Sequence, residues 1–207
     1  MMMFHDRQNA GIQLGKYLIK RSIKIDVVLG LPRGGVVTAS AVADILKKPL
    51  DVMVVRKLGL PGHSEYAVGA IAEGGVEIYN DGILTMLGLD RRDLAGVLKE
   101  EKNRLNDYER QFHRQPRRLA RKSILLVDDG IATGLTALAA IKTCRKMGAR
   151  DVRIAAPVAS TSAARDLKKA ADDAYFLEVD PNFQAVAQYY KQFDQVTNEE
   201  VINLLSL

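Results

Sequence analysis

Residues 124–136 read ILLVDDGIATGLT, and this stretch decides the fold. Its first four residues are apolar and have the composition of a buried strand. Two adjacent aspartates, Asp128 and Asp129, follow directly, and then a turn that contains two glycines and two threonines. A strand with a purely structural purpose does not need two carboxylates together at its end, because like charges repel. We therefore expect a polar ligand at this end of the strand.

The turn after the aspartates has the composition of a phosphate-binding loop. Two glycines permit tight backbone geometry, and the first amides of the helix that follows have no internal partners and carry the positive end of its dipole. Small residues around such amides favour a phosphate, and the threonine hydroxyls add donors. The predicted phosphate contacts are Ala132, Thr133, Gly134, Leu135 and Thr136. For the acidic pair alone, a capping aspartate beside a turn aspartate stays open as an alternative.

Apolar strand-like runs alternate with helix-like stretches along most of the chain. Strands without polar alternation, separated by helices, predict a parallel sheet covered on both faces, which binds ligands at the carboxyl ends of its strands. Three polar loops fall at such ends: PRGG at 32–35, RKLGLPGHSE at 56–65 and DDGIATGLT at 128–136. The predicted strands cover 27–31, 50–55, 123–127, 151–156 and 174–178, and the predicted helices cover 6–21, 36–46, 136–147 and 162–171.

Two segments interrupt this alternation. Residues 67–79, AVGAIAEGGVEIY, are typical of a hairpin that turns at Glu73-Gly74-Gly75. Residues 94–112 form a long helical pattern with apolar side chains near one face and many charges on the other. The wider segment 91–122 holds eleven basic and five acidic residues, a surplus of six, so the rest of the chain sums to about −1 and the net charge of +5 comes from this segment. A solvated helix face is the simplest interpretation of that charge run.

Length and composition predict one soluble domain, residues 1–207. The chain is 47% hydrophobic and 27% charged, and its single cysteine, Cys144, cannot form an intrachain disulfide. No apolar run approaches the roughly 18 residues of a membrane span, and the first residues lack the layout of a secretory signal. We therefore expect a cytoplasmic protein without a membrane partner.

Residues 124–136 resemble the loop that binds phosphoribosyl pyrophosphate (PRPP) in type I phosphoribosyltransferases. The shared pattern is four apolar residues, two acids, a short variable stretch and Thr-Gly-x-Thr. Ala132 departs from the purine enzymes for 6-oxo bases, which often carry a further aspartate there. Response-regulator receiver domains also place an aspartate pair after a strand, but no strand-terminal aspartate appears where their phosphoacceptor should be, and TGLT would be unexplained.

Other loops resemble parts of the same family. Residues 30–36, GLPRGGV, are similar to its pyrophosphate loop, which implies pyrophosphate contacts from Arg33, Gly34 and Gly35. Residues 54–71 occupy the place of its flexible loop and resemble a less characterised branch with an RKxGxPGxxExAxGA-like stretch. The resemblance implies a mobile loop within 56–80 that closes over the leaving pyrophosphate. Its candidate residues are Arg56, Lys57, His63 and Glu65.

The C-terminal segment, residues 176–207, occupies the place of the family's hood over the base. Candidate base contacts are Val158 and Phe183, although aromatic side chains at helical spacing more often belong to a core. The resemblance implies a central five-stranded parallel sheet flanked by helices, with an inserted hairpin, a helical basic insert at about 90–122 and a small hood.

The implied function is transfer of the phosphoribosyl group of PRPP to a nitrogenous small-molecule acceptor, with release of pyrophosphate. Asp128 and Asp129 would contact the ribose and the developing cation, and Lys57 or Arg56 would close over the pyrophosphate and stabilise it as it leaves. Mg²⁺ would be held mainly by the oxygens of the ligand, and a homodimer is expected. A second hypothesis is a PRPP-sensing regulator or nucleic-acid-binding protein on the same fold, because residues 91–122 are basic.

Overall fold

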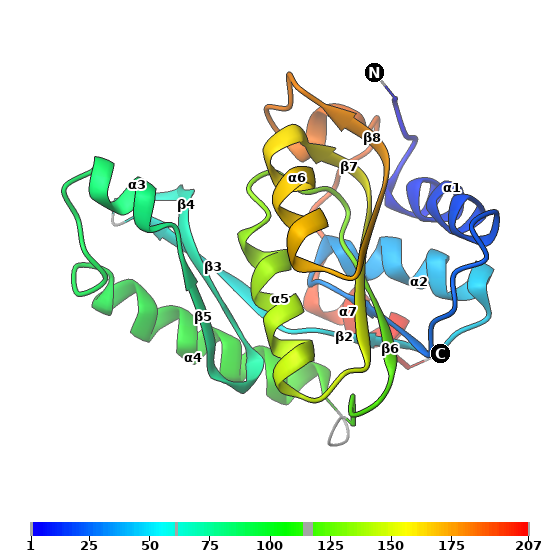
Figure 1. The fold of residues 1–207 in the computed structure, drawn as a ribbon, viewed down its shortest axis with the longest axis horizontal. Helices are drawn as coiled ribbons and strands as arrows, with labels where there is room; N and C mark the ends of the chain where they lie inside the picture. The colour runs from blue at the N-terminus through cyan, green and yellow to red at the C-terminus, as the bar shows by residue number, and fades with distance from the viewer. Residues whose placement is uncertain (1, 61, 114–117, 207) are drawn as a thin grey trace.

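A five-stranded parallel sheet forms the centre of the molecule (Figure 1). The computed structural model describes residues 2–60, 62–113 and 118–206, apart from the side chains of Ser64 and Glu65. The strand order is β2-β1-β6-β7-β8, and every neighbouring pair is parallel. This confirms the predicted fold class. The strands are β1 (Val27–Gly30), β2 (Leu50–Val52), β6 (Ser123–Val127), β7 (Asp151–Ser160) and β8 (Asp173–Asp180).

Helices cover both faces of this sheet, which is why its central strands are apolar on both sides. On one face lie α1 (Arg7–Ile19) and α2 (Gly34–Leu46), and on the other lie α5 (Leu135–Lys146) and α6 (Thr161–Ala170). All residues of β1 and β6 are buried, as continuous apolar runs predict. The close packing of α1 on α2 requires Gly11, because a Cβ atom there would lie 2.5 Å from the carbonyl oxygen of Thr38.

The chain changes direction in the sheet between β1 and β6. From β1 it passes through α2 to the edge strand β2, whereas from β6 it proceeds through β7 to the opposite edge at β8. The carboxyl ends of β1 and β6 are aligned, with Gly30 paired to Val127. Ligands in open parallel sheets bind outside the strand ends at such a switch point. The loops after β1 and β6, which the sequence singled out, begin at this place.

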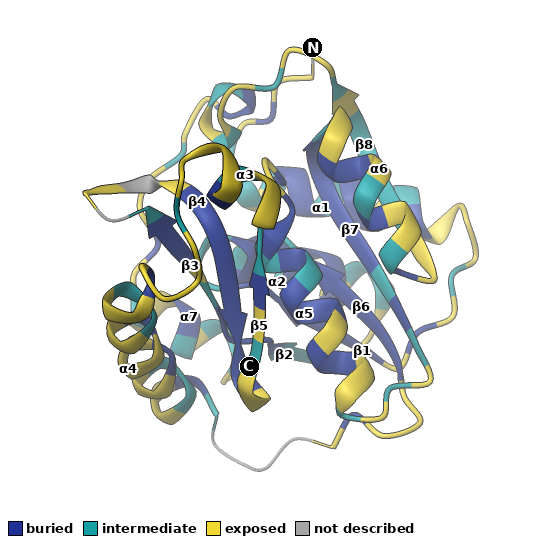
Figure 2. Cartoon of the chain, turned by 60° about the vertical axis from the view of Figure 1, so that its left-hand side comes forward, coloured by how far each residue is buried: buried dark blue, intermediate teal, exposed yellow. Residues whose placement is uncertain are grey.

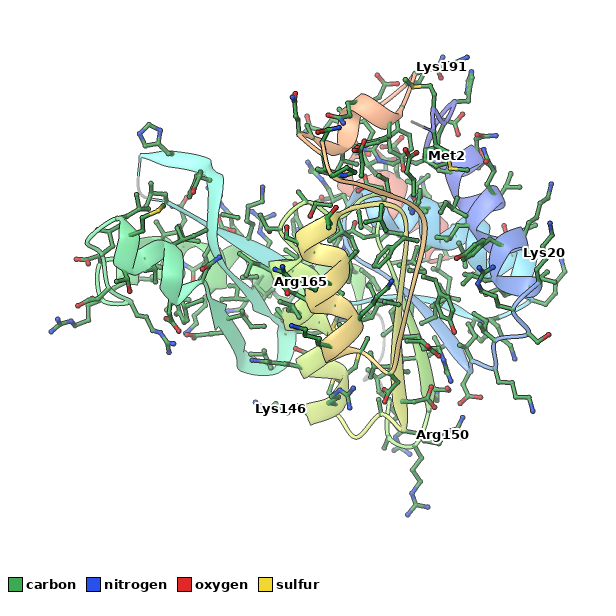
Figure 3. The ribbon with its side chains drawn as sticks, turned by 45° about the horizontal axis from the view of Figure 1, so that its top comes forward. Met2, Lys20, Lys146, Arg150, Arg165 and Lys191 are labelled. Atoms are coloured by element: carbon green, nitrogen blue, oxygen red, sulfur yellow. The ribbon has the colours of Figure 1, made fainter. Side chains whose placement is uncertain are left out.

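A second, smaller sheet projects from the main body. It consists of the antiparallel strands β3 (Val55–Leu60), β4 (His63–Ala72) and β5 (Val76–Tyr79), and it carries α3 (Asp81–Met86) and α4 (Ala95–Phe112). Residues 67–72 of β4 are buried, while α4 exposes its outer face (Figure 2). Lys146 Nζ at the end of α5 donates to the Gly74 carbonyl oxygen at 2.7 Å, which ties the main body to the hairpin (Figure 3). The hairpin turn predicted at residues 73–75 is confirmed by a 3-10 turn at Glu73–Gly75.

Two expectations about this region were wrong. The strand predicted over 50–55 ends at Val52, and Val55 begins β3 in the other sheet. Residues 56–60, expected as part of a mobile loop, instead form most of β3, with Arg56 opposite Ile71 and Lys57 opposite Ala70. Gly59 lies at a shift in the strand register. Glycine is common at such bulges as well as in mobile loops, so its presence misled the prediction.

The C-terminal segment returns to the main body and covers the end of the sheet. It contains a short 3-10 turn (Val186–Tyr189) and α7 (Asn198–Leu204), which lies beside α2 and α4. Its aromatic side chains pack with Phe4, Ala10 and Val158 in a separate apolar cluster. Among the described residues, no helix combines the length and apolarity needed to cross a membrane.

Candidate functional site

The two aspartates after β6 occupy different environments. Asp128 is half-buried, and its Oδ1 accepts a hydrogen bond from the Asp129 amide at 2.9 Å. Burial raises the pKa of the Asp128 carboxyl well above its ordinary value, and the neighbouring Asp129 carboxylate raises it further. Asp129 instead pairs with a cation. The pair therefore consists of one carboxyl poised to hold a proton and one carboxylate that is balanced by an arginine.

Arg7, at the start of α1, is the partner of Asp129. Its Nε donates to Asp129 Oδ2 at 2.7 Å, and only 11% and 13% of the two side chains are exposed. Arg7 also donates to the Asp194 carbonyl oxygen and lies 3.7 Å from the centroid of the Phe193 ring. The Tyr190 hydroxyl donates to the Asp129 carbonyl oxygen, and burial raises the pKa of this phenol. The N-terminal helix and the C-terminal segment thus fix Asp129 from opposite ends of the chain.

The glycines after β1 let the acidic pair approach the other loop. A Cβ atom on Gly34 would lie 2.1 Å from Asp129 Oδ2, and one on Gly35 would lie 2.7 Å from Asp128 Oδ1. A side chain at either position would therefore displace the acidic pair. The preceding peptide bond, between Pro32 and Arg33, is cis. PRGG and the aspartate pair, almost a hundred positions apart in the sequence, therefore form one continuous surface.

The loop between the aspartates and α5 is anchored to the end of β7. The Ile131 amide donates to the Val158 carbonyl oxygen at 2.9 Å, and Ser160 Oγ donates to the Ala132 carbonyl oxygen at 2.6 Å. Gly134 then turns the chain into α5 with φ of 75°. The first-turn amides of α5 have no intrahelical acceptor, and the side chain of Thr133 is exposed while that of Thr136 is half-buried. The loop has the geometry of an anion site at a helix N-terminus.

A cavity of about 950 Å³ lies between the two sheets. Arg33, Asp128 and Thr136 line it from the switch point of the main sheet. Arg56, Lys57, Gly59 and Leu60 line it from β3, and α4 contributes a third wall. The structure therefore brings together the three loops that the sequence predicted to form a site, although one of them is a strand.

The wall from α4 was not predicted. Its residues Val97, Glu100, Glu101 and Arg104 line the cavity. Glu101 Oε2 accepts from Arg56 Nε at 2.7 Å, and Glu101 Oε1 accepts from Arg104 Nη1 at 2.7 Å. In the sequence these residues belong to the run KEEKNR, which is typical of a solvated helix face. Arg7 was also missed, because no local pattern relates it to an aspartate 122 positions away.

Residues 4–194 match the model of the phosphoribosyl transferase domain. The chain belongs to this family. A Mycobacterium tuberculosis protein named "Putative phosphoribosyl transferase" is 41% identical over 207 residues, which cover 99% of this chain and 47% of that protein. The chain thus spans about half the length of this curated relative.

Two solved structures resemble this phosphoribosyl transferase domain. A crystal structure of a Thermus thermophilus protein has a TM-score of 0.78 and 39% identity, and covers 99% of this chain and 98% of its own. The purine phosphoribosyltransferase from Pyrococcus horikoshii has a TM-score of 0.51 and 18% identity, and covers 95% of this chain and 97% of its own. At that lower identity the likeness concerns the fold alone.

The remaining predicted site residues of this phosphoribosyl transferase domain lie at the edges of the site. His63 is exposed at the start of β4 and does not line the cavity. The Glu65 side chain lies outside the described part of the structure. Val158 is fully buried beside Gly130, and Phe183 stacks on the buried Tyr189 with ring centroids 5.3 Å apart. Val158 and Phe183 as base contacts therefore stay predictions, with Phe183 the more accessible of the two.

The cations of α4 and its flanks are largely matched by carboxylates of the same unit. Lys102 pairs with Glu77 of β5 at 2.7 Å, and Arg91 pairs with Asp81 at 2.9 Å. Arg110 pairs with Asp107 on its own helix. Residues 114–117 of the basic segment lie outside the described residues. These pairs favour the solvated-face interpretation of α4 over an uncompensated basic surface for nucleic acid.

The side chains at the cavity suit a magnesium ion that takes most of its ligands from phosphate oxygens and water. Within the described residues, no three His, Cys, Asp or Glu side chains cluster so that they could hold a metal ion. Asp128 is one carboxyl group at the cavity wall. Mg²⁺ commonly binds through one or two carboxylates together with phosphate oxygens and water. The residues present therefore fit an ion that arrives with a phosphorylated ligand.

Proposed function

We propose that the protein binds PRPP and transfers its 5-phosphoribosyl group to a nitrogenous acceptor. One observation carries the proposal: Asp128 of the acidic pair, Thr136 in the first turn of α5 and the cations Arg33 and Lys57 line one cavity at the switch point of the sheet. Membership of the phosphoribosyl transferase family supports the same reaction class. A sugar that carries a phosphate at one end and a pyrophosphate at the other matches this arrangement of groups.

Each part of the site would perform one task. The amides of residues 132–136 and the hydroxyls of Thr133 and Thr136 would hold the 5-phosphate. Arg33 and Lys57 would bind the pyrophosphate, aided by the open backbone at Gly34 and Gly35. When bound, Mg²⁺ would neutralise charge on the leaving group. Asp128, the member of the acidic pair that lines the cavity, would face the ribose.

The reaction breaks the bond between ribose C1 and the pyrophosphate oxygen and forms a bond from C1 to the acceptor nitrogen. The electron pair of the broken bond leaves with pyrophosphate, and the acceptor nitrogen loses its proton to water. Positive charge develops on the ribose as the bond breaks, and preorganised carboxylates stabilise such charge in a site with little water. Positive charge near Asp128 also favours its ionised form, which opposes the effect of burial on its pKa.

Pyrophosphate release tests the proposal. The protein would be incubated with Mg²⁺, PRPP and a panel of purine and pyrimidine bases. We expect release that depends on one acceptor and is abolished when Asp128 and Asp129 are both replaced by asparagine. Glu77→Gln, which removes an ion pair outside the cavity, serves as the matched control and should retain turnover. Unchanged turnover in the double variant would refute the assignment of the acidic pair.

We further propose that the protein acts in the cytoplasm as a homodimer. The absence of a membrane-length apolar run and the single cysteine motivate the location, and the prevalence of dimers in this fold motivates the assembly. Size-exclusion chromatography with light scattering measures the second point directly. A single species at the monomer mass across a concentration series would exclude the dimer.

A further inference from the structure

Helix α4 presents a defined face to the ligand cavity. Val97, Glu100, Glu101 and Arg104 occupy positions i, i+3, i+4 and i+7, which lie on one side of a helix. The outer face of the same helix is exposed to solvent (Figure 2). The cavity wall is therefore a specific charged surface, distinct from the solvated face that the sequence suggested.

Glu101 is the centre of this surface. Its side chain is only 10% exposed, and each of its oxygens accepts from a different arginine: Arg56 of β3 and Arg104 of α4. Arg56 also lies 5.1 Å from the centroid of the Tyr108 ring. A carboxylate with both oxygens engaged restricts the rotamers of both guanidinium groups. Glu101 thereby holds Arg56 of β3 and Arg104 of α4 next to each other at the cavity wall.

The charges around the cavity favour an anion with several charges. Four cations line it, Arg33, Arg56, Lys57 and Arg104, against the three carboxyl groups of Asp128, Glu100 and Glu101. Within the described part of the chain, neither Arg33 nor Lys57 forms an ion pair. The pair between Arg104 and Glu100 is about half-exposed, and such pairs contribute little. An incoming anion can therefore compete with Glu100 for Arg104.

The packing of α4 on the small sheet does not depend on Glu101 alone. Lys102 pairs with Glu77, and His113, just after the helix, pairs with Glu73 at the hairpin turn. Leu105 and Phe112 are buried in the apolar cluster under the helix. The cluster at Glu101 differs from these contacts because its members line the cavity, which indicates a role beyond attachment.

We infer that Glu101 is a positioning residue that holds Arg56 and Arg104 as paired guanidinium contacts for the pyrophosphate group of PRPP. The inference rests on the proposed function. It assigns a binding role to α4, a segment whose charge otherwise indicates only a solvated face. Arginine forks bind phosphate oxygens in a bidentate way, so their orientation matters as much as their charge.

The test compares three ligands that share parts of PRPP. Calorimetry with Mg²⁺ present would measure the affinity for PRPP, for inorganic pyrophosphate and for ribose 5-phosphate, which lacks the pyrophosphate. For Glu101→Gln we expect PRPP and pyrophosphate to bind about tenfold more weakly, equivalent to about 1.4 kcal/mol, and ribose 5-phosphate to bind within twofold of the wild type. Glu77→Gln removes the ion pair between Glu77 of β5 and Lys102 of α4, which has the same 2.7 Å length but lies outside the cavity, and should leave all three affinities unchanged.

A selective loss of affinity for PRPP and pyrophosphate distinguishes a positioning role from a folding defect, because a general disturbance of the site would also weaken the binding of ribose 5-phosphate. Arg104→Gln, at a side chain that is 52% exposed, should reproduce the selective loss and carries the comparison if Glu101→Gln does not fold. If the binding of PRPP and of ribose 5-phosphate weakens equally, or neither weakens, the inference is overturned while the proposed function stands. A wild-type protein that does not bind PRPP overturns both.

Discussion

Gly35 is the glycine whose replacement tests most directly how the two loops meet. It is the second residue of α2 and is buried against the acidic pair. A Cβ atom added there would lie 2.7 Å from Asp128 Oδ1, 2.9 Å from Asp128 Cα and 3.0 Å from the Val127 carbonyl oxygen. Two of these three atoms belong to the backbone of β6 or the residue after it, so they cannot move aside by a change of rotamer.

Gly96 provides a matched comparison. It is the second residue of α4, and a Cβ atom there would meet nothing within 4 Å. Replacing glycine by alanine inside a helix gains up to about 1 kcal/mol from helix propensity, and this gain is common to both positions. Crowding in a packed interior costs about 1–3 kcal/mol. We therefore expect Gly35→Ala to have a free energy of unfolding about 1–3 kcal/mol lower than that of Gly96→Ala.

Urea denaturation of both variants and the wild type would measure this difference, and calorimetry with ribose 5-phosphate would report on the site. Gly96→Ala should be as stable as the wild type or slightly more stable, with unchanged affinity. Gly35→Ala should bind the ligand more weakly, because relief of the crowding displaces Asp128. Equal stability and equal affinity in the two variants would contradict the close contact between the PRGG loop and the aspartate pair.

Two further predictions concern the charges of the site. The raised pKa of Asp128 makes the folded state bind more protons than the unfolded state, so stability falls as pH rises from the ordinary pKa of 3.8 towards the raised value. Asp128→Asn should therefore be more stable than the wild type at pH 7, by about 1.4 kcal/mol per unit of raised pKa. Urea denaturation should show that this difference in stability shrinks towards pH 4. A difference that stays constant with pH would argue against a raised pKa of Asp128. Arg7→Gln leaves a nearly buried Asp129 without its cation and should lower the free energy of unfolding at pH 7 by about 3 kcal/mol. A loss below about 1 kcal/mol in the same assay would show that water compensates Asp129.

The fold class and the main loops could be predicted from the sequence because their signals are contiguous. Residues 124–127 are continuously apolar, and the acids and glycines that follow identify the end of a buried parallel strand. The same holds for PRGG after β1. Glycine was the weaker guide at residues 56–65, where it marks a strand irregularity and a turn, because residues 56–60 form part of a strand where a loop was expected.

Tertiary structure decided which side chains meet at these loops. Arg7 pairs with Asp129 across 122 positions, and Arg56 pairs with Glu101 across 45. Neither pairing leaves a local pattern, because an ion pair depends on where the strand order and the small sheet bring two side chains, whereas strand and loop character depend on neighbours along the chain. The sequence by itself therefore determined the parallel sheet and the position of the glycine-rich loops after β1 and β6. Only the tertiary structure distinguished the environments of the two aspartates and made α4 a wall of the cavity, since both depend on contacts between segments far apart in the chain.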